Sequence, residues 1–210
     1  MSRKDKTVEE IYRKMTQLEH VIARPDTYVG SVQMQSEKMW VWSEETEMMV
    51  NRQINFVPGL YKIFDEILVN ASDNKIRDPK GMDQLKVDID VESCCIKILN
   101  TGRGLPIEIH KEHKIYIPEM VFGHLLTSDN YNDNEKKVTG GRNGYGAKLA
   151  NIFSNKFVVS TADSSRGLKY RQVFEKNMSS VRDPKIDKYS GDDYTEVTFY
   201  PDMSKFGMSG

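Results

Sequence analysis

The sequence of 210 residues has no long apolar run and almost no net charge. No stretch approaches the roughly 20 consecutive apolar residues of a membrane-spanning helix, and the first ten residues alternate charges where a secretory signal would have an apolar core. Thirty basic residues are balanced by thirty-one acidic ones, so no overall positive field marks the chain as a main DNA-binding surface. These absences predict a soluble, intracellular domain without a membrane partner.

Cysteine is also scarce, since the only two, Cys94 and Cys95, are adjacent. Neighbours on a strand point to opposite faces and cannot easily bridge each other or share a metal, so we expect reduced thiols with a packing role. His110, His113 and His124 lack metal-like spacing with any cysteine or acid, and we expect them in surface or packing positions.

Length and composition, with 38% hydrophobic and 29% charged residues, fit one compact globular domain. Apolar periodicity predicts helices at about residues 7–20, 60–75 and 117–126, and a further helix that opens within 139–148 and runs to 153. Alternation predicts strands at 39–44, 85–91, 94–99, 157–161, 168–174 and 194–200, the second and third forming a hairpin. This order predicts an α+β fold, a two-layer α/β sandwich with helices on one face of a mixed, mostly antiparallel sheet.

Some segments are predicted to be irregular or exposed. Residues 24–30 are expected to form a turn with one exposed aromatic side chain, and residues 127–138 a polar surface loop. Four large apolar residues are expected in the core or at a strand edge, not on a base-stacking surface: Trp40, Trp42, Met48 and Met49.

The helix predicted at 60–75 and its extension have a polar side, formed by Glu66, Asn70, Asp73, Asn74 and Arg77. This side could simply be solvated. However, asparagine and aspartate are poor helix formers, and a merely wetted face would favour lysine, glutamate or glutamine. The alternative is a metal–nucleotide site, in which Glu66 orients or deprotonates an attacking water and the side-chain oxygen of Asn70 ligates magnesium.

Two glycine-rich segments could complete such a site. Residues 100–106 could be an ordinary turn, or they could bring backbone against an adenine, with Asn100 accepting a hydrogen bond from its amino group. Residues 139–148 could be a flexible hinge or a phosphate cradle in which successive N–H groups turn toward one anion. Lys148 could then reach a terminal phosphate, although the segment lacks the Gly-Lys-Ser/Thr pattern of a P-loop.

The three segments in this order resemble the GHKL ATPase family, which includes gyrase, the ninety-kilodalton heat-shock chaperones, histidine kinases and MutL proteins. Within it, the chain is similar to the N-terminal ATP-binding domains of eukaryotic type IIA DNA topoisomerases. The similarity covers nearly the whole chain and is carried by residues 17–20, 24–28, 56–71, 106–110 and 135–148.

The resemblance implies a GHKL (Bergerat) fold that binds ATP with Mg²⁺ and hydrolyses it. It implies Glu66 as the general base, Asn70 as the magnesium ligand and Asn100 at the adenine. The implied nucleotide-contacting residues are Asn70, Asp73, Asn74, Asn100, Ser128, Asp129, Asn130, Gly141, Arg142, Asn143, Gly144, Tyr145, Gly146, Ala147 and Lys148. Two positions depart from the family pattern, which has aspartate at the position of Asn100 and serine at that of Asp129, where a carboxylate near phosphates is repulsive unless paired.

The resemblance also implies an assembly. Residues 1–30 would form an arm exchanged between two protomers through the region of Tyr28, although Tyr28 could instead be a simple packing residue. Residues 31–210 would form an ATP-binding domain that stops before a transducer domain, and this fragment is expected to turn ATP over slowly. ATP-driven dimer closure would then gate DNA passage by the full-length enzyme in the nucleus, with little DNA contact by this segment. Two other classes remain as alternatives: a nucleotide-gated interaction module, and a histidine kinase domain that would transfer phosphate and not release it.

Overall fold

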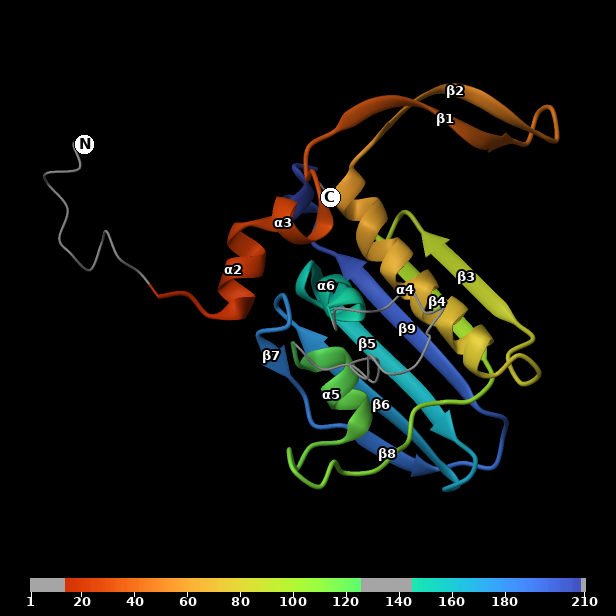
Figure 1. Cartoon of the computed structure of the whole chain (residues 1–210), viewed down its shortest axis with the longest axis vertical. Helices are drawn as coiled ribbons and strands as arrows, with labels where there is room; N and C mark the ends of the chain where they lie inside the picture. The colour runs from red at the N-terminus through yellow and green to blue at the C-terminus, as the bar shows by residue number, and fades with distance from the viewer. Residues whose placement is uncertain (1–13, 126–144, 209–210) are drawn as a thin grey trace, which may run out of the picture.

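The computed structural model describes residues 14–125 and 145–208, which form two layers (Figure 1). The helices α4 (Pro58–Arg77), α5 (Ile117–Gly123) and α6 (Gly146–Ile152) lie on one face of a seven-stranded sheet. The short helices α2 (Gln17–Ala23) and α3 (Pro25–Val29) precede a hairpin of β1 (Gln35–Ser43) and β2 (Met48–Phe56), which projects from the body.

The large sheet is antiparallel at every described pairing. Its strands are β3 (Leu85–Asp90), β4 (Cys95–Thr101), β5 (Ser154–Asp163), β6 (Leu168–Glu175), β7 (Ser180–Val181), β8 (Lys185–Lys188) and β9 (Tyr194–Pro201). They follow the order β3-β4-β9-β5-β6-β7, and β8 also pairs with β6. The last strand, β9, therefore sits in the middle, and the 3-10 helix η2 (Met203–Phe206) follows it. The predicted two-layer sandwich is confirmed.

The core lies between the sheet and the helices. Register places Phe157 opposite Phe199 and Val159 opposite Val197, and all four side chains are almost fully buried. The helices close the core with apolar residues such as Ile63 of α4. Burying each such side chain contributes about 1.5–3 kcal/mol, so this cluster fixes α4 and α6 on the sheet.

The N-terminal region differs from the prediction. Residues 24–30 were predicted to form a turn, but α3 is a helical segment, because Pro25 suits the first helical position and Gly30, with φ of 81°, ends the helix. Tyr28 is half-buried and not simply exposed. The preceding helix α2 begins at a capping box formed by Thr16 and Glu19, and the first part of the predicted helix at 7–20 lies outside the described residues.

Only the first strand of the β1–β2 hairpin was predicted. A strand was expected at 39–44, but β2 was missed, and the two strands form a separate ribbon. Four residues were expected in the core or at a strand edge. They lie in the two strands of this ribbon and are more than half exposed, so the core alternative is wrong for them: Trp40, Trp42, Met48 and Met49. Strands β7 and β8 were also missed, because two and four residues are too few to show a period.

Other expectations concern thiols, loops and membranes. Cys94 lies in the β3–β4 turn, Cys95 begins β4, and both are free thiols. The loop predicted at 127–138 lies outside the described residues. Among the described residues, no helix combines the length and the apolar character that crossing a membrane requires.

Candidate functional site

Helix α4 carries Glu66, the residue predicted to act as general base. The helix begins at Pro58 and turns Ile63, Ile67 and Ala71 into the core. The polar side is covered in part, because the side chain of Glu66 is only 16% exposed, although Arg77 at the end of the helix is exposed. A simply solvated face, the alternative left open by the sequence, does not describe this position.

The carboxylate of Glu66 lies against the first residue of α6. A Cβ placed on Gly146 would overlap with Oε2 of Glu66, so glycine at this position lets the carboxylate keep its place against α6. Lys148 follows two residues later in the first turn of α6 and is 4% exposed. The structure therefore brings the predicted acid and the start of the predicted phosphate-binding helix together.

A lysine on the same helix holds Glu66 in place. The Nζ atom of Lys62 lies 2.5 Å from Oε1 of Glu66, one turn earlier on α4, whereas Asp65 is 3.9 Å from the same nitrogen. The hydrogen bond to Glu66 raises the pKa of Lys62 above its usual value of 10.5, against the lowering effect of burial. Lys62 is thus charged at neutral pH and fixes one carboxylate oxygen, leaving Oε2 toward Gly146.

The remaining polar residues of α4 differ in environment. Asn70 is half-buried one turn after Glu66, and Asp73 is 4% exposed. The Nδ2 group of Asn74 donates a hydrogen bond of 3.4 Å to the carbonyl oxygen of Thr101. Asn74 therefore ties α4 to the end of β4, and contacts of these three residues with a nucleotide stay predictions.

The glycine turn after β4 is held by the end of α4. Oδ2 of Asp78, the C-cap residue, accepts a hydrogen bond of 2.9 Å from the N–H of Arg103, and Oδ1 accepts one of 2.9 Å from the N–H of Gly81. These two bonds are the main cause of a pKa of Asp78 below its usual 3.8. Gly102 has φ of 88°, and a Cβ there would lie 2.7 Å from the nitrogen of Met82. This turn accordingly needs both the glycine and the carboxylate.

The other side of the same turn packs on β5. A Cβ on Gly104 would overlap with the carbonyl oxygen of Ala162, and the hydroxyl of Thr161 accepts a hydrogen bond of 3.1 Å from the N–H of Leu105. Asn100 is 7% exposed, with its Nδ2 group donating to the carbonyl of Thr101 at 3.0 Å. In this arrangement Oδ1 of Asn100 is the acceptor that an adenine amino group would require.

Just beyond this turn, Asp163 at the end of β5 fixes the following loop. Burial would raise the pKa of Asp163, but hydrogen bonds from Ser165, the N–H of Ile107 and Arg166 outweigh it and hold this pKa below 3.8. Arg166 also bonds Glu108 at 2.7 Å. This is a structural network that keeps the loop after the glycine turn against the sheet.

The N-terminal helices contact the start of α6. The ring of Tyr28 lies 5.6 Å from that of Tyr145, the N-cap residue of α6, and its hydroxyl is 2.8 Å from Nδ1 of His20. Within one chain, α3 is therefore in contact with the residue that joins the predicted phosphate cradle to its helix.

Seven predicted site residues lie outside the described residues: Ser128, Asp129, Asn130, Gly141, Arg142, Asn143 and Gly144. Ala147 is buried in α6. No cluster of three or more histidine, cysteine or acidic side chains within residues 14–125 and 145–208 could hold a metal ion.

Sequence reasoning missed three residues that shape the site: Lys62, Asp78 and Thr161. A signal existed for Lys62, because Lys-x-x-x-Glu places opposite charges one helical turn apart. For Asp78 the signal was its position before Pro79, where a helix is expected to end. Thr161 had none, because its contact with residue 105 depends on how β5 enters the sheet.

The structure thus places an acid against the glycine that begins α6, and a buried amide beside a glycine turn, which is the arrangement that the sequence predicts for a nucleotide site. Residues 57–202 match the family described as histidine kinase-, DNA gyrase B- and HSP90-like ATPase. Because this match covers more than half of the chain, the chain belongs to that ATPase family.

Similar proteins narrow the class further. DNA topoisomerase 2 of Candida glabrata is 58% identical over 97% of this chain, which spans 14% of that protein's length. The crystal structure of the ATPase region of Saccharomyces cerevisiae topoisomerase II has a TM-score of 0.94 and 57% identity, covering 96% of this chain and 53% of that one. The ATPase and transducer domains of DNA topoisomerase II from Balamuthia mandrillaris give a TM-score of 0.94 and 52% identity, covering 97% of this chain and 53% of that one.

Proposed function

We propose that this chain is the part of a type II DNA topoisomerase that binds and hydrolyses ATP between α4 and α6. The observation that carries the proposal is the contact between the Glu66 carboxylate and Gly146 at the start of α6. It provides a base at the position where a helix N-terminus favours phosphate.

Glu66 would act on the attacking water. Lys62 holds Oε1, so Oε2 is the oxygen that orients the water or accepts its proton. The low exposure of Glu66 limits competing solvent and favours a fixed carboxylate geometry. Positioning of this kind supplies most of the catalysis in phosphoryl transfer.

Asn70 is the residue on α4 that would hold magnesium. It is half-buried one turn beyond Glu66 and offers a neutral oxygen. Mg²⁺ prefers oxygen ligands, retains several waters and is bound by few protein groups together with substrate phosphates, so a dedicated acidic cluster is not required. When bound, magnesium would neutralise charge on the phosphates.

The glycine turn would receive the base of the nucleotide. Asn100 presents an acceptor, and Asp78 and Thr161 hold the backbone of the turn from two sides. Glycine at 102 and 104 lets that backbone pack closely against its neighbours. The other residues of the implied nucleotide-contacting set belong to this proposal through the family resemblance.

The role in a larger enzyme rests on the relatives named DNA topoisomerase 2. In this proposal ATP closes a dimer through the N-terminal arm, and closure traps a DNA segment in the full-length nuclear enzyme. The Tyr28–Tyr145 contact supports a link between the arm and the nucleotide, because Tyr145 begins the helix that would face the phosphates.

The test is Glu66→Gln, with Asp65→Asn as the matched control on the neighbouring position of α4. Loss of a general base costs about 10²–10⁴-fold in rate, so Glu66→Gln should lower phosphate release by at least about 100-fold while ATP still binds. Asp65→Asn should retain activity. If Glu66→Gln hydrolysed ATP as fast as the unmodified chain, Glu66 would not be the general base. Transfer of phosphate to the protein without release of free phosphate would favour the histidine kinase alternative.

ATP binding should also depend on magnesium. Titration of the Asn70→Ala and unmodified chains with ATP, with and without magnesium, should show that the variant loses most of the gain in affinity that magnesium gives. An equal gain in both chains would assign the ligand to another residue.

A further inference from the structure

The β1–β2 hairpin has one face that nothing in the described structure covers. Register places Trp40 opposite Asn51 and Trp42 opposite Met49, so these side chains share a face. Trp40 is 66% exposed, Trp42 57% and Met49 52%. We call Trp40, Trp42 and Met49 the tryptophan face. Residues on the reverse face, such as Val41, Val50 and Ile54, are half-buried.

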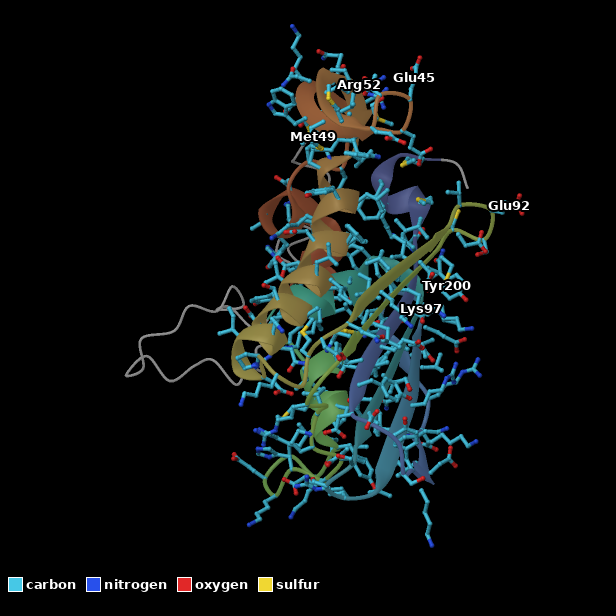
Figure 2. All side chains as sticks on the ribbon, turned by 90° about the vertical axis from the view of Figure 1, so that its right-hand side faces the viewer. Glu45, Met49, Arg52, Glu92, Lys97 and Tyr200 are labelled. Carbon is cyan, nitrogen blue, oxygen red and sulfur yellow. The ribbon has the colours of Figure 1, made fainter. Side chains whose placement is uncertain are left out.

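The ribbon stands apart from the body. Within the described residues, the only extensive contacts of β1 and β2 are with each other, and Figure 1 shows the hairpin curving away beyond the start of α4. In Figure 2, Glu45, Met49 and Arg52 project from the hairpin, far from Lys97 and Tyr200 on the large sheet. A lone two-stranded hairpin is marginal in water, and exposed apolar patches mark interaction sites.

Charge argues against a polyanionic partner. Residues 35–56 contain four glutamates against one lysine and one arginine, and three of the glutamates, Glu44, Glu45 and Glu47, occupy the turn at the tip or its edge. This acidic end would repel DNA and anionic lipid. The occupant is therefore a protein surface.

Size argues against a free second copy. Aromatic side chains cover about 150–250 Å² each, so two tryptophans at these exposures offer roughly 200–300 Å². A stable complex between separate proteins needs about 800 Å² on each side. A surface this small is effective when the partner is tethered, because a short link raises the local concentration to about millimolar.

The end of the described chain lies next to the base of the hairpin, so the segment that follows it is the candidate for a tethered partner. The N–H of Gly59, just after β2, donates to the carbonyl of Ser31, just before β1, at 2.8 Å. A Cβ on Gly59 would lie 3.4 Å from the ring of Phe206, and one on Gly207 would lie 4.0 Å from the carbonyl of Val32. Residues 206–208 thus lie at the base of the ribbon.

We propose that the tryptophan face is the docking surface for the polypeptide that follows Met208 in the full-length protein. The relatives are much longer than this chain, which spans 14% of one of them, and a solved relative joins this domain to a transducer domain. The inference rests on the proposed function only in taking this chain as one domain of such a protein. The docked segment buries both indoles and orders the ribbon.

The test measures cleavage by a glutamate-specific protease at Glu44, Glu45 and Glu47 with mass spectrometry. The full-length protein should be cut at this turn at least about tenfold more slowly than the 210-residue chain, because docking suppresses the opening that cleavage needs. In the full-length protein, the double variant Trp40→Ser/Trp42→Ser should lose this protection. The matched control, Ile89→Ser/Val91→Ser, changes two exposed apolar residues at the end of β3 and just after it, and should keep the protection.

Other outcomes overturn the proposal. Equal cleavage rates for the full-length protein and the 210-residue chain would show that no later segment docks on the tryptophan face. Protection of the 210-residue chain that grows with its concentration assigns the face to a second copy, and protection that needs added duplex DNA assigns it to nucleic acid. Thermal unfolding and ATP binding of the tryptophan variant check that its fold is intact. The protease test does not use the ATPase activity that Glu66→Gln tests, so the docking proposal and the ATPase proposal can fail independently.

Discussion

The ion pair between Lys62 and Glu66 can be tested by Lys62→Met, which keeps the length of the side chain and removes its charge. The pair is short, at 2.5 Å, but Lys62 is 41% exposed and water screens it. Exposed pairs one helical turn apart contribute about 0.3–0.5 kcal/mol. Because the Glu66 side chain is only 16% exposed, we place this pair at the upper end of the range for surface pairs, about 0.5–1 kcal/mol.

The same energy sets the expected loss of rate. If the pair serves to hold Glu66 for the attacking water, losing about 0.5–1 kcal/mol of positioning lowers kcat about two- to fivefold. Affinity for ATP should stay unchanged, because Lys62 acts through the carboxylate. Lys62→Arg should recover most of the rate, and Asp65→Asn, whose oxygen lies 3.9 Å from Lys62, should change it little.

Steady-state ATP hydrolysis gives kcat, and equilibrium binding of ATP gives affinity separately. An unchanged kcat in Lys62→Met would refute the positioning argument. A loss of affinity with kcat preserved would also refute it, since Lys62 would then contact the phosphates directly.

Four further changes probe the site and its frame. Gly146→Ala should abolish ATP turnover with little loss of thermal stability, because the new methyl group displaces only the flexible end of Glu66. Gly102→Ala should cost about 1–3 kcal/mol in the free energy of unfolding, measured by denaturant titration, since φ of 88° and a nearby backbone nitrogen leave no room. Asp78→Ala should weaken ATP binding in calorimetry more than it lowers kcat, because the glycine turn loses its clamp. The pKa of Asp163 lies below 3.8 in the folded chain, so the ionised carboxylate stabilises the fold at pH values above 3.8. This stabilisation is lost as pH falls through the lower folded pKa. Asp163→Asn should therefore flatten the acid side of the stability–pH curve below about pH 4.

The elements around the candidate site could be predicted where apolar residues recur at helical or strand spacing within a short stretch of sequence. Helix α4 was expected at 60–75 and spans Pro58–Arg77, because its apolar residues recur at helical spacing and Pro58 begins it. The polar side that carries Glu66 and Asn70 was predicted from helical spacing and residue types, and its role in a nucleotide site stays a prediction. Strands β3 and β4 and their hairpin followed from alternation and a short turn.

Tertiary contacts explain what the sequence did not reveal. No local pattern places Gly146 against Glu66, because the contact joins residues eighty positions apart through the packing of α6 on α4. Likewise, Trp40 and Trp42 look like core residues by composition, yet they belong to a ribbon that leaves the body. Hydrophobicity predicts that a side chain will be covered, but not by which part of the protein.

Helix α4 also fixes the distance between the two ends of the site. Glu66 lies near its middle and Asp78 caps its end, so twelve residues at 1.5 Å each separate them by about 18 Å along one rigid element. The acid faces α6, while the cap holds the turn beside Asn100 through Arg103. A change that bends α4 between these residues would therefore shift the proposed general base, Glu66, relative to the turn proposed to bind the adenine, without touching either.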